Sequence, residues 1–111
     1  MRAYVWASTL VLALTACTPD PCGAQSPCPN DPRTTPAQSA MCRSALDANR
    51  SSACFAELLD LATCAQANVA CNASGTTDPA LTQTRQRNEC SRQISALQVC
   101  CTSNRTASAC Q

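Results

Sequence analysis

Cysteine content is the sequence feature that most constrains the fold of this chain. Eleven of its 111 residues are cysteines. Such a share, in an exported chain, is typical of a fold held by disulfides rather than by a large apolar core. Large apolar side chains are scarce after residue 17; they are Met41, Leu46, Phe55, Leu58, Leu59, Leu61, Val69, Leu81, Ile94, Leu97 and Val99. We therefore expect one small domain that depends on its bridges for stability.

The N-terminal stretch has the pattern of an export signal. Arg2 supplies a positive start, and residues 3–14 form an apolar run without a charge. A run of this length suits the apolar region of a signal peptide and is too short to cross a bilayer as a helix. An ordinary secretory cleavage site has small residues three and one positions before the cut, and Leu14 fits the first of these badly.

The sequence Leu14-Thr15-Ala16-Cys17 resembles the lipobox of bacterial lipoproteins, whose pattern is a large aliphatic residue, two small residues and cysteine. The resemblance covers residues 1–17. It implies that residues 1–16 are removed, that Cys17 carries a diacylglyceryl thioether, and that the new amino terminus is acylated. Thr18 stands where the family's inner-membrane retention signal is Asp, which implies outer-membrane delivery. The alternative is a plain secreted protein whose Cys17 joins a disulfide.

The odd number of cysteines agrees with a lipid on Cys17. An odd number in an exported protein leaves one cysteine without a disulfide partner. If Cys17 carries lipid, the remaining ten can close five bridges; they are Cys22, Cys28, Cys42, Cys54, Cys64, Cys71, Cys90, Cys100, Cys101 and Cys110. Two or three acyl chains would make the membrane anchor stable.

Prolines dominate the segment that follows the lipidation site. Within residues 17–35 they are Pro19, Pro21, Pro27, Pro29 and Pro32. Prolines at this density exclude a helix and favour extended, polyproline-like chain. We therefore predict a semi-rigid tether over residues 17–35. Cys22 and Cys28 lie within it, and the sequence leaves open whether they bridge to each other or to the domain.

The remainder, residues 36–111, is predicted to be a cysteine-rich, all-α bundle of two to three helices. No proline or glycine interrupts residues 37–74, and good helix formers abound there. The polar stretch 49–52 divides this run into helices over about 37–48 and 52–72, although one continuous helix is the alternative. Residues 72–77 form a loop, and Asp78-Pro79 begins a third helix over about 79–103.

Two matched spacings predict two of the disulfides. Nine residues separate Cys54 from Cys64, and nine separate Cys90 from Cys100. Ten steps along a helix span about 15 Å. If the two helices run antiparallel, Cys54 lies level with Cys100 while Cys64 lies level with Cys90. This arrangement is similar, in geometry only and over residues 54–100, to the twin Cys-x9-Cys hairpin of mitochondrial intermembrane-space proteins. No such argument gives partners for Cys22, Cys28, Cys42, Cys71, Cys101 and Cys110.

The residue inventory offers little catalytic chemistry. The chain contains no histidine, which excludes Ser-His, Cys-His and histidine-metal sites. The adjacent pair Cys100-Cys101 is interpreted as two structural bridges rather than a soft-metal site. Glu57 and Asp60 are interpreted as a solvated helix face. Three arginines near Glu89 suggest a docking patch, but ordinary surface pairing, above all of Arg85 with Glu89, explains them; they are Arg85, Arg87 and Arg92.

We therefore expect no enzyme activity, no cofactor and no metal. Lys plus Arg total 8 and Asp plus Glu total 7, and removal of Arg2 with the leader brings the net charge to about zero. A neutral chain with few aromatic residues is a poor nucleic-acid binder. The leading hypothesis is a lipid-anchored envelope protein with a structural or protein-interaction role, held to the membrane by its lipid and contacting an envelope protein. The alternatives are a carrier of a small apolar ligand and, ranked last, a thiol redox or metal-handling enzyme.

Overall fold

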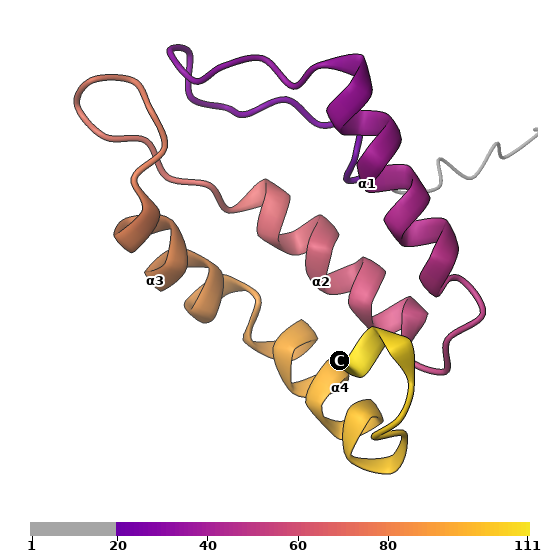
Figure 1. Ribbon diagram of the computed structural model, residues 1–111. Helices are drawn as coiled ribbons and strands as arrows, with labels where there is room; N and C mark the ends of the chain where they lie inside the picture. The colour runs from indigo at the N-terminus through magenta and orange to yellow at the C-terminus, as the bar shows by residue number, and fades with distance from the viewer. Residues whose placement is uncertain (1–19) are drawn as a thin grey trace, which may run out of the picture.

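The computed structural model describes residues 20–111, and helices dominate this part of the chain (Figure 1). The elements are α1 (Pro36–Asn49), α2 (Phe55–Ala67), α3 (Pro79–Glu89), α4 (Ser91–Ser103) and the short 3₁₀ helix η1 (Ser108–Cys110). These residues contain no β-strand, only an isolated antiparallel bridge between Cys71 and Thr77. The all-α, disulfide-stapled fold is thus confirmed. Within residues 20–111, each helix is too short or too polar to cross a membrane.

The first helix has a complete N-terminal cap. The hydroxyl of Thr35 accepts the backbone N–H of Gln38, and the Gln38 side-chain oxygen accepts the backbone N–H of Thr35. Pro36 occupies the first turn, where a missing N–H removes no helical hydrogen bond. The chain leaves α1 after Asn49 and turns before α2 begins at Phe55, so the predicted division of the helical run is confirmed.

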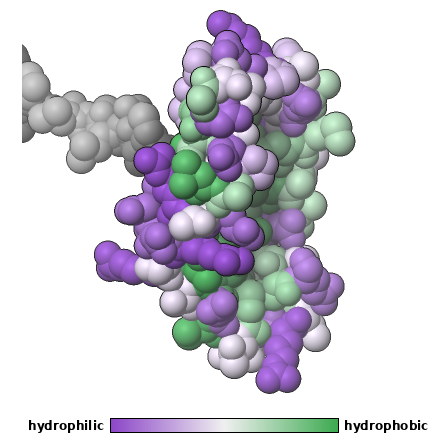
Figure 2. All heavy atoms as spheres, turned by 90° about the vertical axis from the view of Figure 1, so that its left-hand side faces the viewer, coloured by the Kyte–Doolittle hydropathy of each residue, from purple (hydrophilic) through white to green (hydrophobic). Residues whose placement is uncertain are grey.

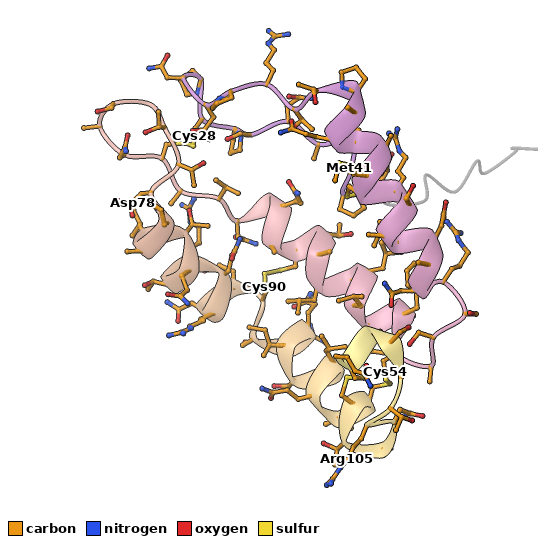
Figure 3. All side chains as sticks on the ribbon, viewed as in Figure 1. Cys28, Met41, Cys54, Asp78, Cys90 and Arg105 are labelled. Atoms are coloured by element: carbon orange, nitrogen blue, oxygen red, sulfur yellow. A yellow bond between two sulfur atoms is a disulfide. The ribbon has the colours of Figure 1, made fainter. Side chains whose placement is uncertain are left out.

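Helices α2 and α4, the central pair, lie antiparallel and pack together more extensively than the other helices, and α2 lies between α1 and α4 (Figure 1). Disulfides join them at two levels: Cys54 to Cys100 and Cys64 to Cys90, each with a Cα–Cα distance of 5.9 Å. These are the two pairs that the antiparallel register predicts. Figure 3 shows Cys54 and Cys90 well separated along this helix pair, and each has an exposed fraction of 0%. One register therefore satisfies both bridges.

The helix predicted over residues 79–103 is wrong in one respect, because it is two helices. Cys90 separates α3 from α4 with φ −105° and ψ 18°, well outside the helical range. No glycine or proline marks this break; Cys90 is instead fully buried and bonded to Cys64. The helix predicted over 52–72 is also shorter than expected, since α2 ends at Ala67 and Cys71 is held in a bridge outside it.

Helices α2 and α4 repeat one local pattern. Each has 13 residues, follows a cysteine in a similar non-helical conformation, and is followed by an asparagine. The side-chain nitrogen of Asn68 donates to the carbonyl oxygen of the cysteine four residues earlier at 2.8 Å, and Asn104 does the same at 2.9 Å. The antiparallel pair therefore has approximate local two-fold symmetry, and its two disulfides occupy equivalent positions.

Residues 20–35 are fastened to the helices. Cys22 is bonded to Cys42 on α1, and Cys28 is bonded to Cys71 in the loop before α3. The backbone N–H of Asn30 also donates to the carbonyl oxygen of Gly75 at 2.8 Å. Both tether cysteines thus bridge to the domain, and this part of the predicted tether belongs to the folded module. Residues 17–19 of the tether lie outside the described residues.

Sulfur atoms supply most of the fully buried apolar core. Among the described residues, the buried hydrophobic side chains are Cys22, Cys28, Cys54, Ala70 and Cys90. By contrast, Met41 is 73% exposed and Val99 is 71% exposed. Figure 2 shows the same property on one face, where hydrophobic residues are visible between hydrophilic ones. The bundle is therefore thin, and its stability depends on covalent bridges.

Candidate functional site

The structure tests the predicted cysteine partners but not the lipidation site. Cys17 lies outside the described residues, as does the rest of the predicted leader. The ten cysteines from Cys22 to Cys110 form five disulfides among themselves. Three of these bridges had no predicted partners: Cys22–Cys42, Cys28–Cys71 and Cys101–Cys110.

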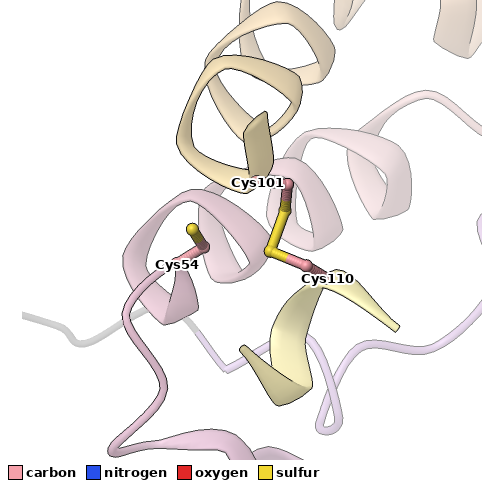
Figure 4. A group of neighbouring side chains, drawn as sticks. All are labelled: Cys54, Cys101 and Cys110. Carbon is pink, nitrogen blue, oxygen red and sulfur yellow. A yellow bond between two sulfur atoms is a disulfide. The ribbon is translucent and has the colours of Figure 1, made fainter. Parts of the chain in front are cut away.

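Sulfur atoms gather at the end of the bundle where α2 begins and α4 ends (Figure 4). The Sγ atoms of Cys54, Cys101 and Cys110 all lie within 4.8 Å of one another. Cys101 and Cys110 are bonded to each other, whereas Cys54 belongs to the bridge with Cys100. Two separate disulfides therefore lie side by side, and we regard these four cysteines, the sulfur cluster, as the candidate functional site.

The helical geometry of α4 explains how the sulfur cluster forms. Consecutive residues on a helix point about 100° apart. Cys100 therefore reaches α2, while Cys101 reaches the C-terminal arm, residues 104–111. The arm turns back after α4, and the backbone N–H of Ala109 in η1 donates to Ser52 Oγ at 3.1 Å. The adjacent cysteines thus serve two structural bridges, as their sequence predicts.

The chemistry open to the sulfur cluster follows from its bonding. A carboxylate oxygen of Glu57 lies within 4.8 Å of the sulfurs of Cys54 and Cys100. A metal would need thiolate ligands, however, and a disulfide sulfur carries no negative charge. Metal binding would therefore require reduction of these bridges. A thiolate released beside a neighbouring disulfide can instead exchange with it, so the arrangement suits thiol–disulfide exchange.

A second cluster, around Asp31, joins residues 20–35 to the loop before α3. The Asp31 carboxylate accepts hydrogen bonds from the hydroxyls of Ser26 and Thr77 and from the backbone N–H of Thr77. The hydroxyl of Ser26, followed by the two donors of Thr77, holds the pKa of Asp31 below its ordinary value. The nearby Cys28–Cys71 disulfide joins the same two segments (Figure 3). This cluster therefore has a structural role.

An open groove of about 280 Å³ lies between α1 and α2. Its apolar lining is Leu46, Phe55 and Leu59. Two ion pairs border it, Arg43 with Asp20 at 2.9 Å and Arg50 with Asp47 at 2.7 Å. The Arg50 guanidinium also lies 5.9 Å from the centre of the Phe55 ring. The groove thus presents a small apolar surface bordered by charges that are already paired.

The remaining predicted surface residues do not form a site. Arg85 donates to the carbonyl oxygen of Val69 at 3.2 Å and makes no ion pair with Glu89, so that predicted pairing is wrong. Sequence reasoning missed Asn68 and Asn104, although each stands four residues after the second cysteine of a Cys-x9-Cys unit. Comparison with protein-family models, with curated proteins and with solved structures gives no match.

Proposed function

We propose that the chain is a lipid-anchored protein of the bacterial cell envelope whose disulfide-stabilised helical module has a structural or protein-interaction role. One observation carries the proposal: the ten cysteines from Cys22 to Cys110 pair completely among themselves. None of them is left to bond Cys17 within the chain. Lipid attachment would modify the Cys17 sulfur, in agreement with the lipobox-like sequence Leu14-Thr15-Ala16-Cys17.

The bridges also support the location. Multiple structural disulfides are typical of proteins that fold in an oxidising compartment outside the cytoplasm. A lipid on Cys17 would hold the module at the membrane surface, and Thr18 favours the outer membrane under the lipoprotein sorting pattern. The folded module begins close to this anchor, because Cys22 is already buried and bonded to α1. The module would therefore stay close to the bilayer.

The role follows from what the module offers chemically. The sequence lacks histidine, and every cysteine among the described residues is in a disulfide. The bridges fix the relative positions of the helices from α1 to the C-terminal arm. Exposed apolar side chains on three different helices could contact another envelope protein; they are Met41, Leu81 and Val99. A stable contact module fits these properties better than a catalyst.

Intact-mass measurement of detergent-extracted protein tests the anchor. We expect a chain that begins at Cys17, carries the mass of a diacylglyceryl group with further acylation, and gains two hydrogens per disulfide on reduction. The Cys17→Ser variant should lack the lipid and leave the membrane fraction while keeping the five bridges. An unacylated native protein would refute the anchor, whatever the state of its disulfides.

Photocrosslinking in intact envelopes tests the contact role. A photoreactive phenylalanine analogue would replace Met41, Leu81 or Val99 in turn, with Arg105, in the turn where the C-terminal arm leaves α4, as a fourth position (Figure 3). We expect one position to capture a single protein reproducibly. Capture of lipid alone at every position would contradict a protein-interaction role.

The groove between α1 and α2 favours a second candidate, a carrier of a small apolar ligand. Leu46, Phe55 and Leu59 would contact the ligand. The groove is open and small compared with typical ligand pockets, which enclose most of their ligand. Binding of a fatty acid should raise the thermal unfolding midpoint of the wild type but not of Leu59→Gln. An equal effect on both would exclude the groove as the binding site.

A further inference from the structure

We propose that the sulfur cluster of Cys54, Cys100, Cys101 and Cys110 is a thiol–disulfide exchange site, in which reduction of the C-terminal bridge is passed to the bridge between α2 and α4. This exchange is a reaction of the folded module with dithiol reductants, and it does not depend on the lipid anchor.

The two bridges of the sulfur cluster lie close together. Exchange begins when a thiolate attacks a sulfur of a neighbouring disulfide. The Sγ atoms of Cys101 and Cys110 both lie within 4.8 Å of Cys54 Sγ (Figure 4). After the C-terminal bridge opens, rotation of one cysteine side chain can close this gap. Elsewhere in residues 20–111, no three cysteine sulfurs come this close together.

The Cys54 sulfur can be attacked only from within the protein. Cys54 has an exposed fraction of 0%, so an external reductant cannot reach its sulfur directly. Cys100, Cys101 and Cys110 are only partly buried. An external dithiol can therefore open either bridge, at Cys100 or at the Cys101–Cys110 pair. Attack on Cys54 Sγ, by contrast, requires a thiolate released beside it within the fold.

One external dithiol supplies the two electrons and two protons that the reaction consumes. The dithiol becomes a disulfide and converts the Cys101–Cys110 bridge into two thiols. The Cys110 thiolate then attacks Cys54 Sγ, forms a Cys54–Cys110 bond and breaks the Cys54–Cys100 bond. Cys100 leaves as a thiolate and takes up the proton that Cys110 lost to solvent. Attack by Cys101 instead gives a Cys54–Cys101 bond, and no further electrons are needed in either case.

A side-chain amide lies beside Cys100, the leaving group of the exchange. The side-chain nitrogen of Asn104 lies 3.8 Å from Cys100 Sγ. An N–H donor at this position stabilises negative charge on the departing sulfur, and a more stable thiolate leaves faster. Asn104 therefore acts as a positioning residue for exchange. Attack by Cys110 leaves free thiols at Cys100 and Cys101.

The repeat within the chain supplies a matched comparison. Asn68 lies 3.6 Å from Cys64 Sγ and 3.6 Å from Cys90 Sγ, so the other bridge between α2 and α4 has the same kind of donor. At the position equivalent to Cys101, however, α2 carries Ala65. This bridge therefore has the donor but lacks the neighbouring disulfide, and it should not exchange.

Limited reduction of the folded wild-type protein tests the proposal. The protein is treated with one equivalent of dithiothreitol at pH 8, alkylated with N-ethylmaleimide, and cleaved with trypsin and a glutamate-specific protease. Cys54 then lies on the peptide 51–57 and Cys110 on the peptide 106–111. In molecules with two labels, we expect either a disulfide between these two peptides or alkylated Cys100 without alkylated Cys54. Labels found only on native partners would overturn the proposal.

Control conditions separate exchange from direct reduction. Reduction with one equivalent of a phosphine at pH 4 should label native partners only, Cys101 with Cys110 or Cys54 with Cys100, because the thiolate fraction falls about 10,000-fold between pH 8 and pH 4. At pH 8, Asn104→Ala should slow the labelling of Cys100 without Cys54 about tenfold, whereas Asn68→Ala should leave it unchanged. Equal slowing by both substitutions, or alkylated Cys100 without alkylated Cys54 at pH 4, would overturn the exchange mechanism.

Discussion

Asn68 places its side-chain nitrogen 2.8 Å from the carbonyl oxygen of Cys64 and 3.6 Å from the sulfur of Cys64. The Asn68 amide thus caps the C-terminal end of α2 and also contacts the disulfide that joins α2 to α4. Asn104 repeats both contacts at the end of α4. The helix ends and the bridges of the central pair are therefore stabilised by the same two residues.

Replacement of either asparagine by alanine should destabilise the fold. Asn68→Ala and Asn104→Ala each leave a helix-end carbonyl without its donor in a partly buried setting, which typically costs about 1 kcal/mol. Asn49→Ala is the matched control, because Asn49 donates to the Ala45 carbonyl at 2.8 Å but does so in an exposed setting. Urea unfolding should show a smaller loss for this control. Equal losses at all three positions would contradict a special role for the central pair.

The disulfides illustrate how far sequence reasoning reaches. Cys54, Cys64, Cys90 and Cys100 lie along helices or at their ends, and helical rise converts their spacing into a register, so their partners are predictable. Cys22 and Cys28 lie in irregular chain without a period, so their sequence cannot indicate which element they reach. Their partners depend on the path of residues 20–35, which is fixed only in the folded protein.

The break at Cys90 shows a different limit. Local propensity favours one helix over residues 79–103, since this stretch contains no glycine and its only proline is at its start. The fold interrupts it because Cys90 must be buried against Cys64. A tertiary constraint therefore overrides local preference. The sulfur cluster was missed for a related reason, because it depends on the C-terminal arm bringing Cys110 back beside Cys54.

The individual bridges should contribute to stability in the order of their loop lengths. The Cys28–Cys71 bridge closes a separation of 43 residues, and Cys101–Cys110 closes 9. On the chain-entropy account, replacing both cysteines by serine should cost about 4 kcal/mol for the first and about 2.5 kcal/mol for the second. Urea unfolding of the two double variants measures this difference. A larger loss from the C-terminal bridge would show that native contacts, not loop closure, set the order.

Complete reduction should abolish the helical fold. Cysteine supplies most of the fully buried apolar side chains, and the larger apolar residues are only partly covered. Such a core cannot offset the chain entropy released when all the bridges open. Far-UV circular dichroism should lose its helical minima in excess reductant at pH 7 and regain them after reoxidation. Retention of the helical signal in fully alkylated protein would contradict this dependence on disulfides.

Stability should fall in acid through Asp31. Its hydrogen bonds favour the charged carboxylate, so the pKa of Asp31 is lower in the folded than in the unfolded chain. The resulting stabilisation is present above the unfolded pKa, near 3.8, and is lost as the pH falls through the lower folded pKa. Thermal unfolding midpoints from pH 7 to pH 2 should therefore fall less steeply for Asp31→Asn than for the wild type.

Asp20 provides a comparison that separates two causes of acid sensitivity. Its pKa is also lowered, chiefly by hydrogen bonding to Arg43 and also by the charge of that guanidinium. Salt screens an exposed ion pair, whereas the neutral donors around Asp31 respond little to salt. In 1 M NaCl the Asp20→Asn effect should shrink and the Asp31→Asn effect should persist. Equal sensitivity to salt would show that the Asp31 contribution is also a charge interaction.

Gly75 should be the glycine that cannot be replaced. It has φ +76°, and a Cβ atom there would approach Asn30 Nδ2 to 2.6 Å. Gly75→Ala therefore adds backbone strain and displaces Asn30, which donates to the Ser74 carbonyl; we expect a loss of more than about 1 kcal/mol. Gly23→Ala is the control, because its added Cβ would meet only the flexible Asp20 side chain closely, at 3.2 Å. Urea unfolding should show only a small change in stability for Gly23→Ala. Comparable losses of stability at both glycines would contradict this prediction. They would mean that the left-handed conformation of Gly75 does not hold residues 20–35 against the loop before α3.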